Sequence, residues 1–372
     1  MPNPYHYGSP VTGDQFAGRH TEVHALVDRM RDGINVVVVS PRRYGKTSLL
    51  KRAAQITTED GAAVVSVTAM GVADLRSFAA QLIAGVYAAK GGKWHRARQA
   101  VPEFLKRLRV TPTITFDGDR PTFGLTAQLS TADLDSVLAD VYELLSELSA
   151  RRPAALIVDE FQDVLNIGTH LPALFKSLAD QHPDVALVVA GSKRHIMEQL
   201  VLDATAPLYG MTTRIALAPI PDAEMSDFLV RRAGVGDKEL PVAVADRIVA
   251  LAGPVPNDIQ YLAYEVYGAA GRTITDRDVD EGIRLAVEHE ADFNAWRFDA
   301  LSPGQRRVLK QLAQSPTAQP YSDDFRREVN ARSPGGLRNA VRPLIDQDLV
   351  AMVDGAYRVT SPFFAQWLRS QP

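Results

Sequence analysis

The chain has 372 residues, 46% of them hydrophobic, so two or three globular domains with their own cores are expected. Its formal net charge of −3 excludes a generally basic nucleic-acid binder, but a local basic face remains compatible with it. There are no cysteines, which excludes disulfides, thiolate metal sites and cysteine nucleophiles and fits a reducing compartment. Neither a signal peptide nor a run of 18 apolar residues is present, so we expect a cytoplasmic protein without a membrane span.

The first helical pattern carries His20 and His24, which are four residues apart. No further ligand is near them in the sequence, so we interpret both as residues of a surface helix rather than of a metal site. The other histidines show no spacing that indicates a metal cluster.

Five short apolar runs alternate with helical patterns from residue 34 to about residue 218. Near-continuous apolar runs are typical of strands that are buried on both faces of a parallel sheet. Alternation with helices predicts an α/β domain with right-handed crossovers, which we assign to residues 1–220. The predicted strands are Ile34–Val39, Ala62–Val67, Ala154–Val158, Val185–Ala190 and Ile215–Leu217.

The first apolar run ends in a tight loop that a helical segment follows. A strand–loop–helix segment that contains Gly-Lys-Thr indicates phosphate binding, because loop N–H groups and the helix dipole both favour an anion. We expect Lys46 to reach the β- and γ-phosphates and the Thr47 hydroxyl to hold Mg²⁺. Ser40 stands where the usual pattern has a glycine. The candidate nucleotide-binding residues of this loop are Ser40-Pro41-Arg42-Arg43-Tyr44-Gly45-Lys46-Thr47-Ser48.

Residues 91–130 are interpreted as an insertion in this domain. Segments 110–116 and 124–129 are predicted to pair as a hairpin across Asp117-Gly118. The first half of the insertion is basic, and we favour a solvated helix face over a nucleic-acid contact for it. Its basic residues are Lys93, His95, Arg96, Arg98, Lys106, Arg107 and Arg109.

The predicted strand Ala154–Val158 leads directly into Asp159 and Glu160. Ligands of open α/β sheets bind beyond the carboxyl ends of the strands, so Asp159 is expected beside the Gly45–Thr47 loop, where it would hold the Mg²⁺ shell. Glu160 would then orient and polarise the attacking water. The alternative is an acidic pair that caps the next helix.

The predicted strand Val185–Ala190 is followed by Gly191 and Ser192. Ser192 is expected to sense the γ-phosphate or to hold the water, and capping of the following helix is an equal alternative. Phosphoryl transfer needs positive charge near the γ-phosphate. Lys193, Arg194 or Arg214 could supply it within the chain or across a subunit interface, although surface charge is the simpler interpretation for each.

Motifs elsewhere in the sequence distinguish between the classes of enzyme that use such a phosphate-binding loop. A guanine-specific Asn-Lys-x-Asp motif is absent from the sequence. A small-molecule kinase would not need a glutamate directly after the metal-binding aspartate. The adjacent acids therefore favour hydrolysis by an activated water, with adenine as the base.

The pattern changes twice in the second half of the chain. Residues 221–298 are purely helical, with predicted helix starts at Asp222, Pro241 and Thr275-Asp276, and we interpret them as a helical lid. Residues 299–372 are assigned to a winged helix. Its expected elements are helices near 303–314, 322–330 and 335–342 and strands at Leu349–Val353 and Ala356–Val359, with Pro343 ending the third helix.

Residues 3–220 resemble the archaeal-type ATPase family of P-loop proteins, which is close to the AAA+ and STAND ATPases. The resemblance implies that the N-terminal segment from Asn3 to Glu22, which includes Phe16, Gly18 and Arg19, lies near the adenine. A likeness to STAND proteins implies that Pro256 contacts the nucleotide. Met211 departs from the family pattern, which has arginine there, and Arg214 is a candidate substitute. The matching segments are Asn3-Pro4-Tyr5-x-Tyr7-Gly8, Phe16-x-Gly18-Arg19-x-x-Glu22, Pro41–Leu50, Asp159-Glu160-Phe161-Gln162, Gly191-Ser192 and Pro207-Leu208-Tyr209-Gly210. In the expected lid, Ala252-Gly253-Pro254-Val255-Pro256 is similar to the Gly-x-Pro element of STAND proteins.

The expected fold is thus a P-loop NTPase parallel sheet, a helical lid and a winged helix. The expected function is that of an ATP-binding, Mg²⁺-dependent ATPase that acts as a nucleotide-driven switch. Residues 299–372 carry ten Lys or Arg and seven Asp or Glu, a net charge of +3, and Arg338 and Arg342 share a face of the recognition helix. Duplex DNA, a protein client and a second copy of the chain are the candidate partners. Two alternatives remain: a DNA-binding regulator with a structural nucleotide, and a partner-sensing scaffold.

Overall fold

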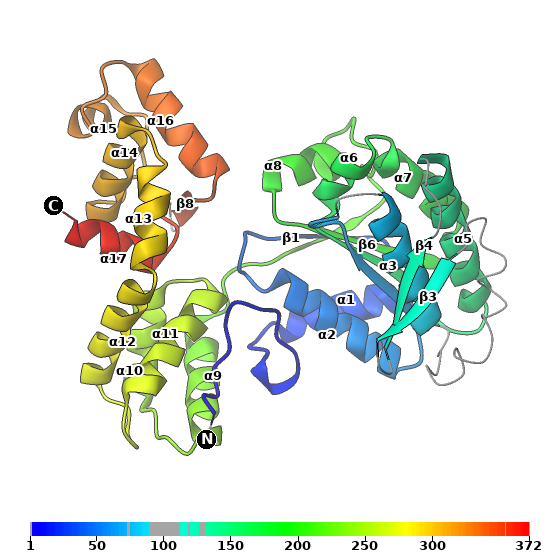
Figure 1. The fold of residues 1–372 in the computed structure, drawn as a ribbon, viewed down its shortest axis with the longest axis horizontal. Helices are drawn as coiled ribbons and strands as arrows, with labels where there is room; N and C mark the ends of the chain where they lie inside the picture. Colours follow the sequence, from blue (N-terminus) through cyan, green and yellow to red (C-terminus); the bar gives the residue numbers. More distant parts are fainter. Residues whose placement is uncertain are drawn as a thin grey trace. The chain divides into compact units, whose positions relative to one another are not determined.

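A five-stranded parallel sheet forms the centre of the first half of the chain, as predicted (Figure 1). The strand order is β2-β5-β6-β1-β7, so β6 lies between β5 and β1. This order places the ends of β1, β6 and β5 at one edge of the sheet. The strands are β1 Val36–Val39, β2 Ala63–Thr68, β5 Ala154–Asp159, β6 Val185–Gly191 and β7 Thr213–Ala216.

The computed structural model describes residues 2–72, 75–89, 112–117, 120–125, 131–353 and 355–371. Two compact units make up the chain. Pro10–Ala218 form one unit, and Met1–Ser9 together with Pro219–Pro372 form the other.

Alternate side chains of each strand enter two separate cores, as the period of two along a strand requires. Val36 and Val38 pack against α1 (His20–Arg31) and α2 (Lys46–Glu59). Val37 and Val39 face the other core, which α3, α5 and α7 cover. Burial of each of these valines contributes about 1.5–3 kcal/mol, which explains why an uninterrupted β-branched run forms a central strand. The covering helices are α3 Leu75–Ala89, α5 Thr131–Ser149 and α7 Leu171–Gln181.

Short helical turns follow the strand ends that face the candidate site. After β5 come the 3₁₀ turn η3 (Phe161–Asp163) and α6 (Val164–Ile167). After β6 come α8 (Arg194–Met197) and the π-helical turn η4 (Glu198–Leu202). A further 3₁₀ turn, η1, spans Gly13–Gln15 before α1.

The predicted hairpin of the insertion is present. β3 (Pro112–Asp117) and β4 (Arg120–Leu125) are antiparallel, with Asp117 opposite Arg120, so the second strand begins four residues earlier than predicted. The basic cluster from Lys93 to Arg109 lies outside the described residues.

The helices after Pro219 begin where their capping residues predict. α9 starts at Asp222, α10 directly after Pro241 and α12 at Asp276, where Thr275 and Asp278 form a reciprocal capping box. Pro256 is the first residue of α11, a favourable position because its missing N–H is not needed there. The helices are α9 Asp222–Val235, α10 Val242–Ala252, α11 Pro256–Ala269, α12 Asp276–His289 and α13 Ala291–Asp299.

The N-terminal segment packs on these same helices. Asn3 Nδ2 donates to the Tyr264 carbonyl at 2.8 Å, and Tyr5 Oη donates to the Leu229 carbonyl at 2.7 Å. Tyr5 is 2% exposed and stacks edge-on against Tyr267. Within its compact unit, this segment is therefore held by α9 and α11.

The C-terminal elements form a winged helix around one apolar core. The third helix continues through Pro343 to Asp346, so the prediction that Pro343 ends it was wrong. Leu337, Val341 and Leu344 are buried on one face, and their burial offsets the loss of about 3 kcal/mol that an internal proline causes. The elements are α14 Pro303–Gln314, α15 Asp323–Glu328, α16 Pro334–Asp346, β8 Val350–Val353, β9 Ala356–Val359 and α17 Pro362–Ser370. The last helix was not predicted.

Candidate nucleotide site

The loop after β1 turns sharply into α2. Gly45 has φ +85°, a left-handed conformation that glycine adopts without a steric penalty, and α2 begins at the next residue, Lys46. Arg43 also has a positive φ of 65°. The N–H groups of a first helical turn have no acceptor within the helix, so this turn presents donors and the positive end of the helix dipole. Ser40 is buried and its hydroxyl donates to the Pro41 carbonyl at 3.1 Å.

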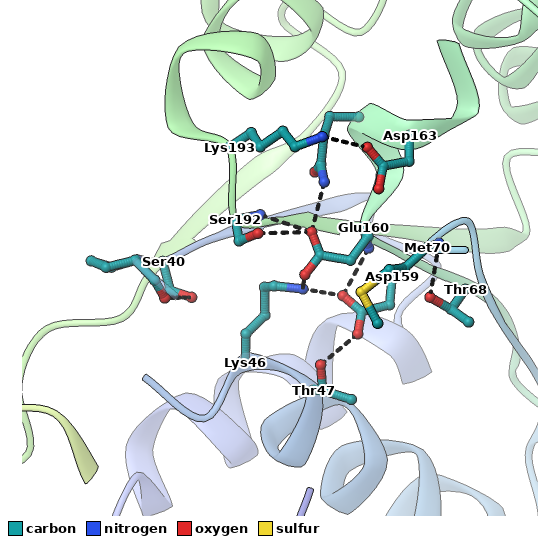
Figure 2. Close-up of polar contacts among 12 residues, drawn as sticks. Ser40, Lys46, Thr47, Thr68, Met70, Asp159, Glu160, Asp163, Ser192 and Lys193 are labelled. Carbon is teal, nitrogen blue, oxygen red and sulfur yellow. Dashed lines mark hydrogen bonds and ion pairs between the residues drawn. The ribbon is translucent and has the colours of Figure 1, made fainter. Parts of the chain in front are cut away.

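The loop lysine lies against both acids that follow β5 (Figure 2). Lys46 Nζ forms an ion pair with Asp159 Oδ1 and lies 3.0 Å from Glu160 Oε1. Thr47 Oγ1 donates to the second oxygen of Asp159 at 2.7 Å. Lys46 and Asp159 are 5% and 7% exposed, so the contact is buried and little screened by water. The expectation that Asp159 arrives beside the loop matches this geometry.

Glu160 is held on both carboxylate oxygens. Its backbone has φ +50°, unusual for a residue with a side chain, and this directs the chain into η3. Oε1 faces Lys46, whereas Oε2 accepts from Gln162 Nε2 at 2.7 Å, from Ser192 Oγ at 2.9 Å and from the Ser192 N–H at 3.2 Å. Burial alone would raise the pKa of Glu160. The charge of Lys46 and the hydrogen bonds from Gln162, Lys46 and Ser192 outweigh it, so this pKa is lowered.

Ser192 follows β6, the strand between β1 and β5. Its hydroxyl and N–H both donate to Glu160, so in this structure it contacts the candidate base. The neighbouring Lys193 pairs with Asp163 of η3 at 2.9 Å. The turns after β5 and β6 are therefore joined by two adjacent polar contacts, which local sequence patterns did not indicate.

Arg19 braces the loop from the side of α1. It has φ +60°, is 4% exposed, and donates from Nη2 to the Tyr44 carbonyl at 3.0 Å and to the Ala218 carbonyl at 2.9 Å. Ser48 accepts a hydrogen bond from the Val11 N–H at 3.0 Å, so its hydroxyl faces the N-terminal segment. These contacts hold the loop and its helix in place.

The remaining predicted residues come from the same loop and from other segments of the chain. Gly18 is buried and has φ +58°, and Phe16 is half-buried against the core of α1 and α2. Arg214 is exposed on the edge strand β7, opposite Val37 and two residues before the end of β1. The side chain of Arg194 lies outside the described set. Pro41, Arg42 and Arg43 are exposed, and Pro256 belongs to the other compact unit.

The C-terminal residues match a known domain family. Residues 295–370 match the family model described as "Probable winged helix domain". No curated protein is significantly similar to the chain.

Solved structures match the chain over nearly its whole length. A Walker-type ATPase of Pyrococcus abyssi has a TM-score of 0.66 at 16% identity, covering 98% of this chain and 99% of that one. The chain has the fold of a Walker-type ATPase. The ORC2 protein of Aeropyrum pernix, solved in ADPNP and ADP complexes, has a TM-score of 0.56 at 13% identity and covers 94% and 92%. The ORC1 protein of the same organism, solved in complex with DNA, has a TM-score of 0.51 at 13% identity and covers 97% and 94%.

Two further findings concern this Walker-type fold. None of the helices among the described residues is long and apolar enough to cross a membrane. In the same part of the chain there is no cluster of three or more His, Cys, Asp or Glu that could hold a metal ion.

Proposed function

We propose that this chain is an Mg²⁺-dependent ATPase that acts as a nucleotide-driven switch. The proposal is carried by one observation: Lys46 and Thr47 of the loop helix contact the acids at the end of β5, Asp159 and Glu160. A lysine at a helix N-terminus, beside a hydroxyl and a carboxylate, is the arrangement with which P-loop NTPases hold phosphates and Mg²⁺. One neighbour of the same fold, the ORC2 protein that was solved with ADPNP and ADP, supports nucleotide as the ligand.

The residues present fit a magnesium nucleotide. Thr47 Oγ1 and Asp159 Oδ2 lie 2.7 Å apart, and hydroxyl and carboxylate oxygens are the ligands that Mg²⁺ prefers, with water filling the other positions. Gly45 has open space where a Cβ would point, so nothing from the protein fills that side of the loop. When bound, the ion would neutralise phosphate charge and the two acids of the site.

Each protein group then has a defined task. Lys46 and the N–H groups of the first turn of α2 bind phosphate oxygens. Lys46 pairs with Asp159 and Glu160 here, so phosphate must compete with these carboxylates for its charge. Glu160, kept ionised by its surroundings, accepts the proton of the attacking water, and Ser192 orients its carboxylate.

The test of this proposal is phosphate release from ATP with Mg²⁺, with EDTA, and in the Glu160→Gln and Lys46→Ala variants. We expect the wild type to hydrolyse ATP and EDTA to abolish this turnover. Glu160→Gln should lose turnover but still bind nucleotide, whereas Lys46→Ala should lose both turnover and affinity. Turnover that survives EDTA or both substitutions would refute the proposal. Hydrogen exchange of residues 219–371 should differ between the ATP and ADP states if the chain is a switch, and identical exchange would exclude that part.

A second inference concerns the winged helix, for which duplex DNA is the partner we propose. Arg338 and Arg342 are exposed on α16, where they share one face. The ORC1 neighbour, solved in complex with DNA, supports this choice. We expect affinity for a duplex to fall steeply with salt and the slope to decrease in the Arg338→Ala/Arg342→Ala variant.

The matched control is Arg327→Ala, which removes an exposed arginine of α15 that pairs with Asp324 instead. Binding that ignores salt, or that falls equally in the control, would favour a protein client. The mass of the particle in each nucleotide state would show whether Arg194 or Arg214 can act across a subunit interface, because a monomer excludes that role.

A further inference from the structure

Gln162 is a buried residue of the site whose amide is only half used. It is 3% exposed and lies in η3, two residues after Glu160. Its Nε2 donates to Glu160 Oε2 at 2.7 Å, whereas its Oε1 accepts no hydrogen bond from any described residue. A buried acceptor without a donor is destabilising, so the orientation needs a reason.

The reason lies in the charge of the neighbouring carboxylate. If the amide were turned over, its oxygen would face the ionised Glu160 and the two would repel each other. With the donor toward Glu160, the unpaired oxygen points at Gly191, where any Cβ would overlap with Gln162 Oε1 and with the Met197 side chain. Because Gly191 at the end of β6 has no side chain, it leaves room for the Gln162 amide.

The two oxygens of Glu160 therefore have partners of different kinds. Oε1 faces Lys46, whose charge a phosphate would compete for, while Oε2 is bonded to Gln162 and Ser192, which belong to η3 and to the segment after β6. Loss of the Lys46 contact would leave the bonds to Oε2 in place. The carboxylate would then stay fixed while its other oxygen becomes available to a water.

We propose that Gln162 is a positioning residue that holds Glu160 in its reactive orientation, with Gly191 providing the room for its amide. This inference rests on the proposed ATPase function, because it gives a role to a residue that acts only through Glu160. It predicts that Gln162 affects the rate of the chemical step and not the binding of nucleotide.

The experiment is steady-state ATP turnover and ADP titration of the Gln162→Met variant, which keeps the length of the side chain and removes its donor. Since hydrogen bonds to charged groups are among the stronger ones, we expect kcat to fall on the order of tenfold to a hundredfold, with KM and the ADP Kd within about twofold. The thermal midpoint should not fall, because the substitution also removes the unpaired acceptor. Gly191→Ala should give the same change in kcat by displacing the amide.

Two comparisons separate positioning from a general structural effect. Asp163→Asn, one residue further along η3, breaks the pair with Lys193 and should leave kcat within about threefold of the wild type. In single turnover, Glu160→Gln/Gln162→Met should be no slower than Glu160→Gln alone, because a positioning residue has nothing left to position.

The outcomes distinguish the two proposals. A wild-type chain that neither binds nor hydrolyses ATP overturns both. Normal wild-type turnover with an unchanged kcat in Gln162→Met, or an equal loss in the Glu160→Gln background, overturns the role of Gln162 alone.

Discussion

Replacement of Glu160 by glutamine should separate nucleotide binding from turnover. The substitution keeps the shape of the side chain and removes one of the two negative charges that Lys46 faces. At an effective dielectric constant of about 20, a charge pair 3.0 Å apart attracts by roughly 5 kcal/mol before compensation. The variant loses this pair, but Asp159 still pairs with Lys46 and the new amide can turn its oxygen toward Lys46, so the ammonium group keeps part of its stabilisation.

Lys46 then has less attraction to lose when it contacts phosphate. We therefore expect the free energy of ATP binding to become more favourable by about 1.4 kcal/mol, which is about tenfold tighter binding. Turnover should fall by about 10² to 10⁴, the usual contribution of a general base. The change in affinity and the change in rate thus have opposite signs, which simple damage to the site would not produce.

The assay is calorimetric titration with ATP and Mg²⁺ alongside phosphate release at saturating ATP. Asp163→Asn is the control, since it removes a nearby charge that pairs with Lys193 and not with Lys46. A Glu160→Gln protein that hydrolyses ATP within threefold of the wild type, or that binds ATP more weakly, would refute the reasoning.

Three further outcomes can be measured. Lys46→Ala should weaken ATP binding at least about a hundredfold and lower the thermal midpoint, because it leaves the buried Asp159 and the half-buried Glu160 without a cation; unchanged affinity in the titration would contradict this. Thr47→Ala should bind ADP without metal as the wild type does but lose the gain in affinity that Mg²⁺ provides, and an intact gain would remove Thr47 from the metal site. Burial would raise the pKa of Asp184, but hydrogen bonds from Ser149 and Ser146 lower it below its usual range. The stabilisation is therefore fully present above the ordinary pKa of an aspartate and lost as the pH falls through the lowered pKa, so denaturant melts of Asp184→Asn and the wild type should differ at pH 7 and approach each other under acid conditions.

The sheet and most helix starts could be predicted because their signals are local. Four consecutive valines favour a strand that is buried on both faces. Thr275, followed by Asp278 three positions later, is a sequence pattern typical of a helix start, and α12 begins there. Lys46 and Asp159 are 113 positions apart in the sequence. Their proximity could still be predicted, because both follow the carboxyl ends of parallel strands, where ligands of such sheets bind. The side-chain partners within the site were beyond such rules, as Ser192 illustrates by contacting Glu160.

The errors also have physical causes. Pro343 was given too much weight, since burial of one face of α16 outweighs one lost hydrogen bond near the helix end. Helix α17 had a readable start, because Ser361 accepts from the Phe364 N–H and Pro362 occupies the first turn, but it follows a wing after which no helix was expected. The contact of Asn3 with α11 was not anticipated and contradicts no prediction; its partner lies 261 positions away, so no local pattern contains it.

The contacts of the N-terminal segment with α9 and α11 determine how the chain can be divided into fragments that fold. A fragment that starts at Pro219 would keep the helices but lose the tyrosine that lies between them, together with the bonds to the Tyr264 and Leu229 carbonyls. A short peptide with the sequence of residues 2–9 should rescue such a fragment when added separately. Residues 2–9 are therefore structurally part of the unit that residues 219–371 form.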